Sequence, residues 1–572
     1  MMKNAKLYDV RPIESIRDMV ISSCEVFAER TAYLKKQKKS MPYEPVTYAE
    51  FKEIVWNLGT RLLNMGLGGK RVAIISENRY EWVLAYMASV CGDMTVVPID
   101  RELAASDIIN LLKISKASAV VYTGKLSADL AGVKDAVPEV QYMITMDSDK
   151  ATDGELKLYD LITEGETLRK GGDASYDDVT IDVNAAKILL FTSGTTALSK
   201  GVLLSHKNIA TNLMGMCSMV DIRPTDVFLA TLPIHHTYAS TCGIMAPLYR
   251  GSCVAFADGL KYILNNLKES KTTVLLGVPA MFELIHKRIW AMARQNGLEG
   301  KLKMGLKLSG GLRKLGIDAR RKIFKTVLDN FGGEIRLFVS GAAAIEPAIS
   351  KSFHDMGILF LQGYGITECA PIVSLNRDIN YKDDAIGLPL PGVDIKIDNP
   401  NEEGIGEIIC RGDNIMLGYY ENDEATGEVI KDGWFYTGDY GRIDEDGFVK
   451  FEGRKKNIII AKNGKNVYPE ELETMLSKSD YVAECMVYGH DDEDGETTIH
   501  AQVFPDMQAV ELVLGTNPDE AKVKELIQSV VDDVNKHNPV WKYIRKTVIR
   551  KEEFEKTTTK KIKRFAEANK EK

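Results

Sequence analysis

A short polar loop between two apolar runs carries side chains suited to holding a polyphosphate. The loop consists of Thr192, Ser193, Gly194, Thr195 and Thr196, with Lys200 four residues further on, and it separates residues 188–191 from residues 202–204. Small residues between two core strands can turn backbone N–H groups inward as an anion nest. The hydroxyls add donors and Lys200 adds a charge. The spacing is not that of the Walker loop, and a solvated turn rich in Ser and Thr is the alternative interpretation.

A second polar group lies at residues 362–368, QGYGITE. Tyr364 offers an aromatic face, and Gly365 allows a close backbone approach. Thr367 is a hydrogen-bond donor, and Glu368 is a hard oxygen ligand of the kind that Mg²⁺ prefers. One Glu after a turn is usually structural, so the interpretation depends on the whole heptapeptide.

Further candidates lie nearer the C-terminus. Asp439 ends the stretch DGWFYTGD, which out of context is typical of a turn. Residues 541–572 are rich in Lys and Arg, and taken alone they indicate a solvated tail or a contact for acidic surfaces.

Alternating strands and helices must position these groups. The patterns predict a helix over 46–66, strands at 71–76, 95–99 and 119–122, and further helices at 80–90 and 108–112, with residues 141–146 as an added strand. This alternation predicts an α/β fold with a parallel sheet covered by helices on both faces. Residues 147–183 are polar and acidic and are expected to form a surface connection. Residues 227–249 contain no charged side chain, but their prolines and histidines favour a buried strand, loop and helix over a membrane span.

Composition limits the class of protein. The chain is 45% hydrophobic and 27% charged, as soluble globular proteins are. The net charge of −8 does not indicate a nucleic-acid binder. Eight scattered cysteines without a CxxC pair argue for a reducing compartment. With no apolar run of signal-peptide length at the N-terminus, we expect a cytoplasmic protein and leave peripheral membrane contact open.

These motifs resemble, in order, those of the acyl-adenylate-forming superfamily, which includes acyl-CoA synthetases and peptide-synthetase adenylation domains. The loop at 192–201 resembles the family's TSGTTGxPKG, with Ala197 and Ser199 as departures from it. Residues 364–368 match YGxTE, and residues 404–420 match GExxxxGxxxMxGY. Residues 554–564 resemble the PKTxxGKxxR block in the form found in long-chain acyl-CoA synthetases. The resemblance extends from Thr47 to Arg564.

The resemblance implies a role for each matching residue. Lys561 would be the catalytic lysine, with Lys560 and Lys563 as alternative registers, and His236, Thr367 and Glu368 would act beside it. Glu368 and Thr192 would bind Mg²⁺. His236, Gly277 and Val278 would border the carboxylate and the acyl chain. Lys456 would be the hinge pivot, and Gly464 would serve the coenzyme A step. The nucleotide contacts would be Thr192, Ser193, Gly194, Thr195, Thr196, Lys200, Gly341, Ala342, Ala343, Gly363, Tyr364, Gly365, Thr367, Asp439 and Arg454.

The implied architecture is a large N-terminal domain of several subdomains over residues 1–453, with parallel-rich sheets and flanking helices. A hinge at 454–457 and a small mobile α+β domain at 458–572 would follow.

The implied activity is activation of a carboxylic acid by ATP and Mg²⁺ to acyl-AMP and pyrophosphate, followed by thioester formation with coenzyme A. The segment at 331–336 and the C-terminal block favour a medium- or long-chain fatty acid. Three alternatives remain: transfer to an acyl carrier protein, adenylation of an amino acid or aryl acid, and a catalytically dead nucleotide-binding regulator. No aspartate lies between His236 and Phe256, which counts against an amino-acid substrate.

Overall fold

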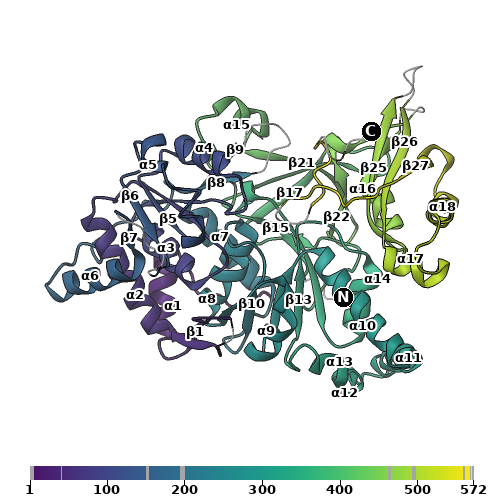
Figure 1. Cartoon of the computed structure of the whole chain (residues 1–572), viewed down its shortest axis with the longest axis horizontal. Coiled ribbons are helices and arrows are strands. Elements are labelled where there is room, and N and C mark those ends of the chain that lie inside the picture. Colours follow the sequence, from purple (N-terminus) through teal and green to yellow (C-terminus); the bar gives the residue numbers. More distant parts are fainter. Residues whose placement is uncertain are drawn as a thin grey trace. The chain divides into compact units, whose positions relative to one another are not determined.

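The computed structural model describes residues 6–39, 41–147, 149, 154–192, 200–461, 465–491, 497–557, 561–566 and 569 (Figure 1). The chain divides into two units, which are described separately. The first unit comprises Met1–Ala343, Ala348–Asp394 and Arg411–Gly433, and the second comprises Ala344–Pro347, Ile395–Cys410 and Trp434–Lys572. The sequence predicts domains at 1–453 and 458–572 with a hinge between them. These limits stay a prediction.

The first unit contains an eight-stranded sheet in the order β19-β9-β8-β4-β3-β5-β6-β7. Its strands from β8 to β7 are parallel, and the β8–β9 hairpin and β19 add antiparallel strands. The strands are β3 (Arg71–Ile75), β4 (Thr95–Pro98), β5 (Ala119–Tyr122), β6 (Tyr142–Thr145), β7 (Leu156–Lys157), β8 (Ala186–Thr192), β9 (Lys200–Ser205) and β19 (Gly418–Tyr419). Every residue of β4 and β5 is buried, as expected for parallel strands covered on both faces.

A nine-stranded sheet in the same unit has the order β16-β15-β14-β13-β12-β10-β11-β1-β2. Its central strands, from β14 to β1, are parallel. The strands are β1 (Thr31–Lys35), β2 (Glu44–Thr47), β10 (Val227–Ala230), β11 (Cys253–Phe256), β12 (Val274–Gly277), β13 (Leu337–Ser340), β14 (Leu359–Gly365), β15 (Ile372–Leu375) and β16 (Leu388–Pro389). Two parallel-rich sheets with flanking helices confirm the expected α/β class.

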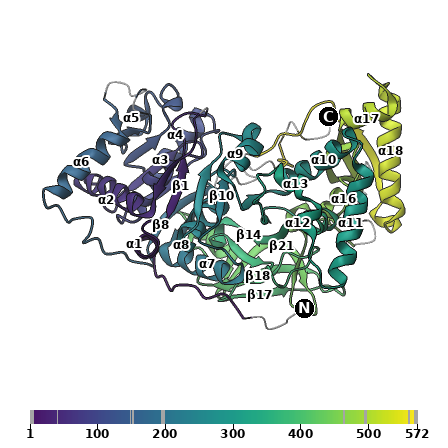
Figure 2. The ribbon, with the colours of Figure 1, turned by 90° about the horizontal axis from the view of Figure 1, so that it is seen from below.

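Helices pack on these sheets, and α7 (His206–Met219) contacts β9 of one sheet and β15 of the other. A capping box of Ser205 and Asn208 begins α7, and Thr47 with Glu50 begins α2 (Tyr48–Asn64) in the same way, which satisfies backbone N–H groups at both helix starts. The other helices are α1 (Ile16–Val26), α3 (Tyr80–Val90), α4 (Ala105–Ser115), α5 (Val133–Ala136), α6 (Leu158–Lys170), α8 (Ala246–Arg250), α9 (Ile263–Ser270), α10 (Pro279–Gln295), α11 (Glu299–Lys314), α12 (Arg320–Ile323), α13 (Lys325–Asp329), α14 (Pro347–Asp355) and α15 (Asp423–Val429). Figure 2 shows α1, α2, α3 and α6 gathered in one part of the unit.

The described residues of the second unit contribute to three sheets, one of them a two-stranded ribbon, and form three α-helices. In the first sheet β18 (Gly406–Gly412) lies between β17 (Val393–Asp398) and β21 (Trp434–Ile443), and β22 (Val449–Arg454) pairs with β21. In the second, β26 (Thr497–Pro505) pairs with β25 (Val482–Asp491) and β27 (Ile544–Ile549). The remaining elements are a ribbon of β23 (Ile459–Ile460) and β24 (Asn466–Val467), and α16 (Pro469–Leu476), α17 (Met507–Leu514) and α18 (Glu520–Lys536). Helix α16 begins at Pro469, whose fixed φ and missing N–H suit the first position of a helix.

One sequence expectation is wrong, and one interpretation that composition alone suggested does not hold. Residues 147–183 are more than a surface connection, because α6 lies within them and packs against α2. Tyr176 is fully buried and its hydroxyl donates to the carbonyl of Ala88. The basic C-terminal region is not simply a solvated tail, since β27 within it pairs with β26. In both cases the sequence interpretation followed average polarity, whereas a few apolar residues at the right spacing decide burial.

Two further observations bear on the cellular setting. All eight cysteines lie among the described residues as buried thiols without a disulfide. No helix in the described part of the chain is long and apolar enough to cross a membrane.

The contact between α6 and α2 can be tested at Gly165. A Cβ added there would lie 1.8 Å from the carbonyl oxygen of Asn57, a backbone atom that cannot move aside cheaply. We expect Gly165→Ala to lower stability by about 1–3 kcal/mol, measured as a fall in the thermal midpoint by circular dichroism. Gly310→Ala is the matched control, because nothing lies within 4 Å of a Cβ added to this residue of α11, and there alanine should stabilise by up to about 1 kcal/mol. Equal midpoints for the two variants would contradict the packing.

Candidate active site

The β8–β9 hairpin brings Thr192 and Lys200 opposite each other. They are paired residues in the antiparallel register, and the Thr192 hydroxyl donates to the Lys200 carbonyl at 3.4 Å. Both therefore border the polar loop between the strands. Four predicted phosphate contacts, Ser193, Gly194, Thr195 and Thr196, lie outside the described residues, as do Ala197 and Ser199.

Tyr419 joins this hairpin to Glu368. The Lys200 ammonium lies 4.7 Å from the centre of the Tyr419 ring, and the Tyr419 hydroxyl donates to the Glu368 carboxylate at 2.9 Å. Burial, followed by the charge of Glu368, raises the pKa of Tyr419, so its hydroxyl keeps its proton and remains a donor. A cation, a phenol and a carboxylate thus meet at the mouth of the hairpin. The sequence interpretation quoted the motif containing Tyr419 but gave this residue no role.

Buried amides hold the turn that carries Glu368. The side-chain amides of Asn212 and Asn414 both donate to the carbonyls of Cys369 and Ile372, at 2.8–3.2 Å. The backbone N–H of Met416 donates to the carbonyl of Glu368 at 2.8 Å. Neither asparagine was singled out from the sequence, because a polar residue in a helix (Asn212) or in a turn (Asn414) gives no signal of which distant group it will meet.

The residues before Glu368 pack tightly. Tyr364 is buried, whereas Gly363 and Thr367 are half-buried. A Cβ on Gly365 would lie 2.1 Å from the carbonyl oxygen of Pro371, so glycine is required by a neighbouring part of the same turn. Glycine is therefore needed at 365 for the packing of the protein's own backbone, and the expected approach of this residue to a nucleotide stays a prediction.

The turn after β13 lies beside the end of β12. Gly277 is paired with Ser340, and the N–H of Gly341 donates to the Gly277 carbonyl at 3.2 Å. Ala342 has a φ of 75°, in the left-handed region that favours glycine. The Tyr238 ring covers Gly341, where a Cβ would lie 3.0 Å from it. The structure thus brings the predicted adenine contacts Gly341, Ala342 and Ala343 next to the predicted acyl-pocket residues Gly277 and Val278.

Residues following strands of the eight-stranded sheet fasten the loop that carries His236. Asn78, after β3, accepts from the Ile234 N–H at 2.9 Å and donates to the Leu232 carbonyl at 2.7 Å. Asp100, after β4, lies 3.6 Å from the Nε2 atom of His235. Such crevices at the carboxyl ends of parallel strands are common ligand sites.

His235 and His236 lie ring to ring, with centroids 4.2 Å apart. Burial lowers the pKa of His235 to about 4, so this ring is neutral near neutral pH. His235 therefore contributes no positive charge to the attraction of a substrate carboxylate. The family resemblance gives the carboxylate role to His236 and gives His235 no role.

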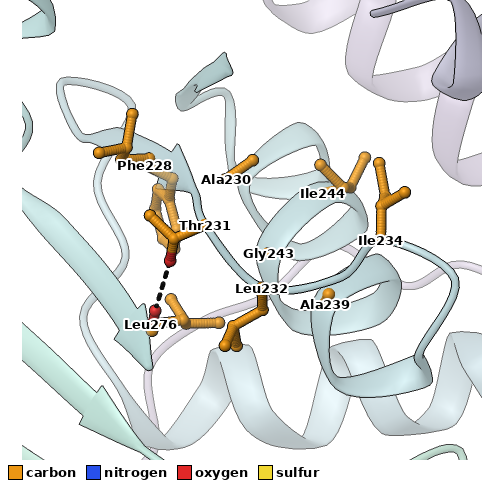
Figure 3. Close-up of a pocket in the computed structure, with 10 residues that line it drawn as sticks. Phe228, Ala230, Thr231, Leu232, Ile234, Ala239, Gly243, Ile244 and Leu276 are labelled. Carbon is orange, nitrogen blue, oxygen red and sulfur yellow. Dashed lines mark hydrogen bonds between the residues drawn. The ribbon is translucent and has the colours of Figure 1, made fainter. Parts of the chain in front are cut away.

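A small pocket lies behind this loop (Figure 3). It has about 310 Å³ of space, including open solvent at its mouth. The Thr231 hydroxyl donates to the Leu276 carbonyl at 3.2 Å across one side of the pocket. A π-helix, Tyr238–Met245, forms the opposite wall, and Gly243 within it leaves room for the neighbouring side chains. The lining residues are Phe228, Leu229, Ala230, Thr231, Leu232, Ile234, Ala239, Gly243, Ile244 and Leu276. The lining is mostly apolar, and the enclosed space is about large enough for one water molecule.

In the second unit, Asp439 and Arg454 form an ion pair across β21 and β22. They are register partners, with the guanidinium 3.2 Å from the carboxylate, and Asp439 is 2% exposed as a residue. The adjacent N–H of Gly438 donates to Glu407 at 3.0 Å, and Lys455 pairs with Glu407 at 2.7 Å.

Two lysines are influenced by this ion pair. Surrounding protein atoms, and then Arg454, lower the pKa of Lys561 to about 8, with Asp439 acting in the opposite direction, although the residue as a whole keeps exposed surface. The same causes in the same order lower the pKa of Lys456. Lys563, an alternative register for the catalytic lysine, instead pairs with Glu555 at 2.6 Å. Lys560 and Gly464 lie outside the described residues.

The donor set around Glu368 is compatible with Mg²⁺. Among the described residues, no group of three or more His, Cys, Asp or Glu side chains could hold a metal ion. Mg²⁺ does not require such a group, because it commonly binds one or two carboxylates together with substrate phosphates. Glu368 is half-buried, and the Tyr419 hydrogen bond is made by one of its two carboxylate oxygens.

Comparisons with known families cover most of the chain. The model of the AMP-binding enzyme family matches residues 22–420, and that of the AMP-binding enzyme C-terminal domain matches residues 456–570.

Curated relatives and solved structures agree with these matches. The chain is 26% identical to fatty acyl-CoA synthetase B of Dictyostelium discoideum, over 92% of this chain and 83% of that one. It is 30% identical to long chain acyl-CoA synthetase 1 of Arabidopsis thaliana, over 83% of this chain and 76% of that one. Its fold is similar to that of the anthranilate CoA ligase AuaEII in complex with anthranoyl-AMP, with a TM-score of 0.76, 20% identity, and 99% and 98% of the two chains covered. It is also similar to ATP-bound MatB from Rhodopseudomonas palustris, with a TM-score of 0.74, 23% identity, and 96% and 97% covered.

The hydrogen bonds of Asn212 give a test of how the Glu368 turn is held. Asn212→Ala removes two donors to buried carbonyls and one acceptor for the Ile372 N–H. We expect a loss of about 1–3 kcal/mol and faster hydrogen–deuterium exchange in residues 366–376. Asn330→Ala is the control, because its amide bonds only an exposed carbonyl, that of Thr326. Unchanged exchange in 366–376 for Asn212→Ala would show that Asn414 suffices.

Proposed function

The chain belongs to the AMP-binding enzyme family, and on that premise we propose that it is an AMP-forming ligase that joins a fatty acid to coenzyme A. The observation that carries the proposal is the meeting of Lys200, Tyr419 and Glu368 at the hairpin mouth, because a cation and a held carboxylate suit a magnesium polyphosphate. The names of the relatives, fatty acyl-CoA synthetase and long chain acyl-CoA synthetase, support the choice of acid and thiol.

In the proposed first step, a carboxylate oxygen attacks the α-phosphorus of ATP. The new P–O bond gives acyl-AMP, and pyrophosphate leaves with the electrons of the broken P–O bond. Lys200 and the hairpin loop hold the outgoing phosphates, and Thr367 donates to the α-phosphate. The Lys561 ammonium neutralises the charge that builds on the α-phosphate oxygens.

Glu368, with Thr192, is proposed to hold Mg²⁺, which when bound neutralises phosphate charge and orients the leaving group. The nucleotide is held by contacts with each of its parts. Tyr364 and the turn of Gly341, Ala342 and Ala343 contact the adenine, and the Asp439 carboxylate accepts from the ribose hydroxyls. Arg454 both fixes Asp439 and reaches the nucleotide.

In the proposed second step, the thiol sulfur of coenzyme A attacks the acyl carbonyl carbon, and AMP departs. We propose that residues 458–572 rotate about Lys456 between the steps, which withdraws Lys561 and brings the loop around Gly464 to the site. The charges of Arg454 and Asp439 act on the pKa of both Lys456 and Lys561. This supports the assignment, because the proposed pivot and the lysine that would move both lie near the same ion pair.

The acyl chain is proposed to lie along Gly277 and Val278, with its carboxylate near His236. Each methylene that is buried there contributes about 0.8 kcal/mol, so apolar walls favour a long acid. We retain a cytoplasmic location as a prediction from the cysteine chemistry.

The role of Lys561 predicts a pH dependence of the first step. Its ammonium must be protonated to act, and its pKa is lowered to about 8. Pyrophosphate release should therefore fall as the pH rises through about 8, whereas Lys561→Arg should keep a flat profile because a guanidinium stays charged. Release is measured between about pH 6 and pH 10.

The control for this profile is Lys563→Gln, which removes a lysine paired with Glu555 and should leave the profile unchanged. Lys561→Ala should abolish the first step and spare thioester formation from supplied acyl-adenylate. A wild-type profile that is flat through pH 8, or equal loss of both steps in Lys561→Ala, would contradict the assignment.

The acid and the acceptor are tested together by pyrophosphate release with acetate, octanoate, palmitate, benzoate and amino acids, with and without coenzyme A. We expect release with long acids that increases severalfold when coenzyme A is added. Pyrophosphate release that does not change when coenzyme A is added would indicate an acyl carrier protein as acceptor. Release with an amino acid would indicate an amino-acid adenylating enzyme. No pyrophosphate release with any of the acids would favour a catalytically inactive, nucleotide-binding regulator.

A further inference from the structure

A helical hairpin of the first unit is strongly basic, although the chain as a whole is acidic. Helices α10 and α11, with the turn between them and the residues that follow, span residues 279–317 and are called the basic hairpin below. The segment contains eight Lys and Arg against two Glu, a net charge of +6, whereas the whole chain has −8. The hairpin is thus one of two basic segments of an acidic protein, the other being residues 541–572, where twelve Lys and Arg stand against five Glu.

The basic hairpin also exposes large apolar side chains. Of the 22 exposed large hydrophobic residues in the described part of the chain, seven lie within it. They are Leu284, Met292, Leu298, Met304, Leu308, Leu315 and Ile317. Single exposed Leu or Met residues are ordinary, but a concentration of this kind in 39 residues marks an interaction surface.

The exposed residues of α11 form a stripe. Met304 and Leu308 are 65% and 54% exposed and lie four residues apart, and Leu315, just past the helix, is 76% exposed. Residues at this spacing share one face of a helix. Lys301 and Lys307 flank the stripe, and no described side chain forms an ion pair with either of them. The outer face of α11 is therefore apolar along its middle and basic along its sides.

The opposite face of α11 is already occupied. Leu302 is buried, and the Ser309 hydroxyl donates to the Asp355 carbonyl at 3.1 Å. A Cβ on Gly305 would lie 3.3 Å from side-chain atoms of Ile323 and Phe324, so the helix is seated on α12 at that point. The stripe of Met304, Leu308 and Leu315 is thus not a core face awaiting a neighbouring element. Helix α11 lies beside α10, as Figure 1 and Figure 2 show.

We propose that the basic hairpin docks on an anionic lipid bilayer, with Met304, Leu308 and Leu315 entering the interface and Lys301 and Lys307 facing the lipid phosphates. A helix with a basic rim and an apolar stripe has the chemistry of interfacial membrane binding. Charge complementarity selects the anionic surface, since the remainder of the chain is acidic and would be repelled by it.

If the proposed function holds, docking of the basic hairpin would also bring the enzyme close to its fatty-acid substrate. Helix α10 begins at Pro279, directly after the proposed acyl-chain contacts Gly277 and Val278. Fatty acids partition into bilayers, so an enzyme held at the bilayer meets its substrate at a high local concentration.

The test uses the full chain and flotation with vesicles, and it requires no catalytic activity. Vesicles of phosphatidylcholine alone are compared with vesicles that also contain phosphatidylglycerol. We expect the protein to float only with the anionic vesicles and to be released by high salt. Each lysine near an anionic surface contributes roughly fivefold to partitioning, so Lys301→Gln/Lys307→Gln should lower it by about tenfold or more.

A second variant tests the apolar stripe. Met304→Gln/Leu308→Gln keeps good helix formers at exposed positions and should also lower binding at least severalfold. Matched controls in the second unit are Lys522→Gln/Lys524→Gln in α18 and Leu512→Gln/Val513→Gln in α17, where Leu512 is 89% exposed. Both controls should float like the wild type.

The proposal is overturned if the wild type stays unbound by anionic vesicles, or if the hairpin variants float as well as their controls. It is also overturned if the hairpin variants change the sedimentation coefficient of the protein without changing flotation, because the stripe would then contact a second copy of the chain. Failure of the fatty-acid assay together with normal flotation would reject the proposed function and leave this inference standing.

Discussion

Two buried asparagine amides hold the turn on which the arrangement of the first unit's site depends. Asn212 and Asn414 each donate to the carbonyls of Cys369 and Ile372. A buried carbonyl without a partner is costly, so these bonds fix the turn more firmly than apolar packing alone would. Glu368 is thereby held within reach of Tyr419, and Tyr419 in turn lies against Lys200. The carboxylate and the cation thus belong to one connected set of contacts built from distant parts of the chain.

Burial sets the protonation states around this set. The Tyr419 hydroxyl is kept protonated because its surroundings and Glu368 both oppose a negative charge there. His235 is kept neutral by burial beside His236. Lys561 is the contrasting case, since its surroundings and Arg454 bring its pKa to about 8, within the range in which enzymes work. Groups that only hold the site are therefore insensitive to moderate changes of pH, whereas the lysine proposed to act on the phosphate is sensitive.

The distribution of charge shows why averages over a chain conceal function. A net charge of −8 argues against a nucleic-acid binder, and that argument holds for the whole surface. The same average hides a segment of 39 residues with a net charge of +6 and a stripe of exposed Met and Leu. The tertiary structure shows which residues of α11 pack on α12 and which are exposed. Only the exposed residues, such as Met304 and Leu308, are available to contact a partner.

The sequence by itself determined the local elements and the identity of the motifs. Apolar runs predicted β3, β4 and β5 to within two residues, and apolar residues at helical spacing predicted α2, because these signals depend on near neighbours along the chain. It missed α6, whose burial depends on a glycine meeting the backbone of α2. It also gave no hint that Asn212 and Asn414 share two carbonyls, that Tyr419 links Lys200 to Glu368, or that Asp439 and Arg454 are register partners. These contacts join residues up to about two hundred positions apart, and only the tertiary structure decides them, because a side chain carries no local sign of which distant group it will meet.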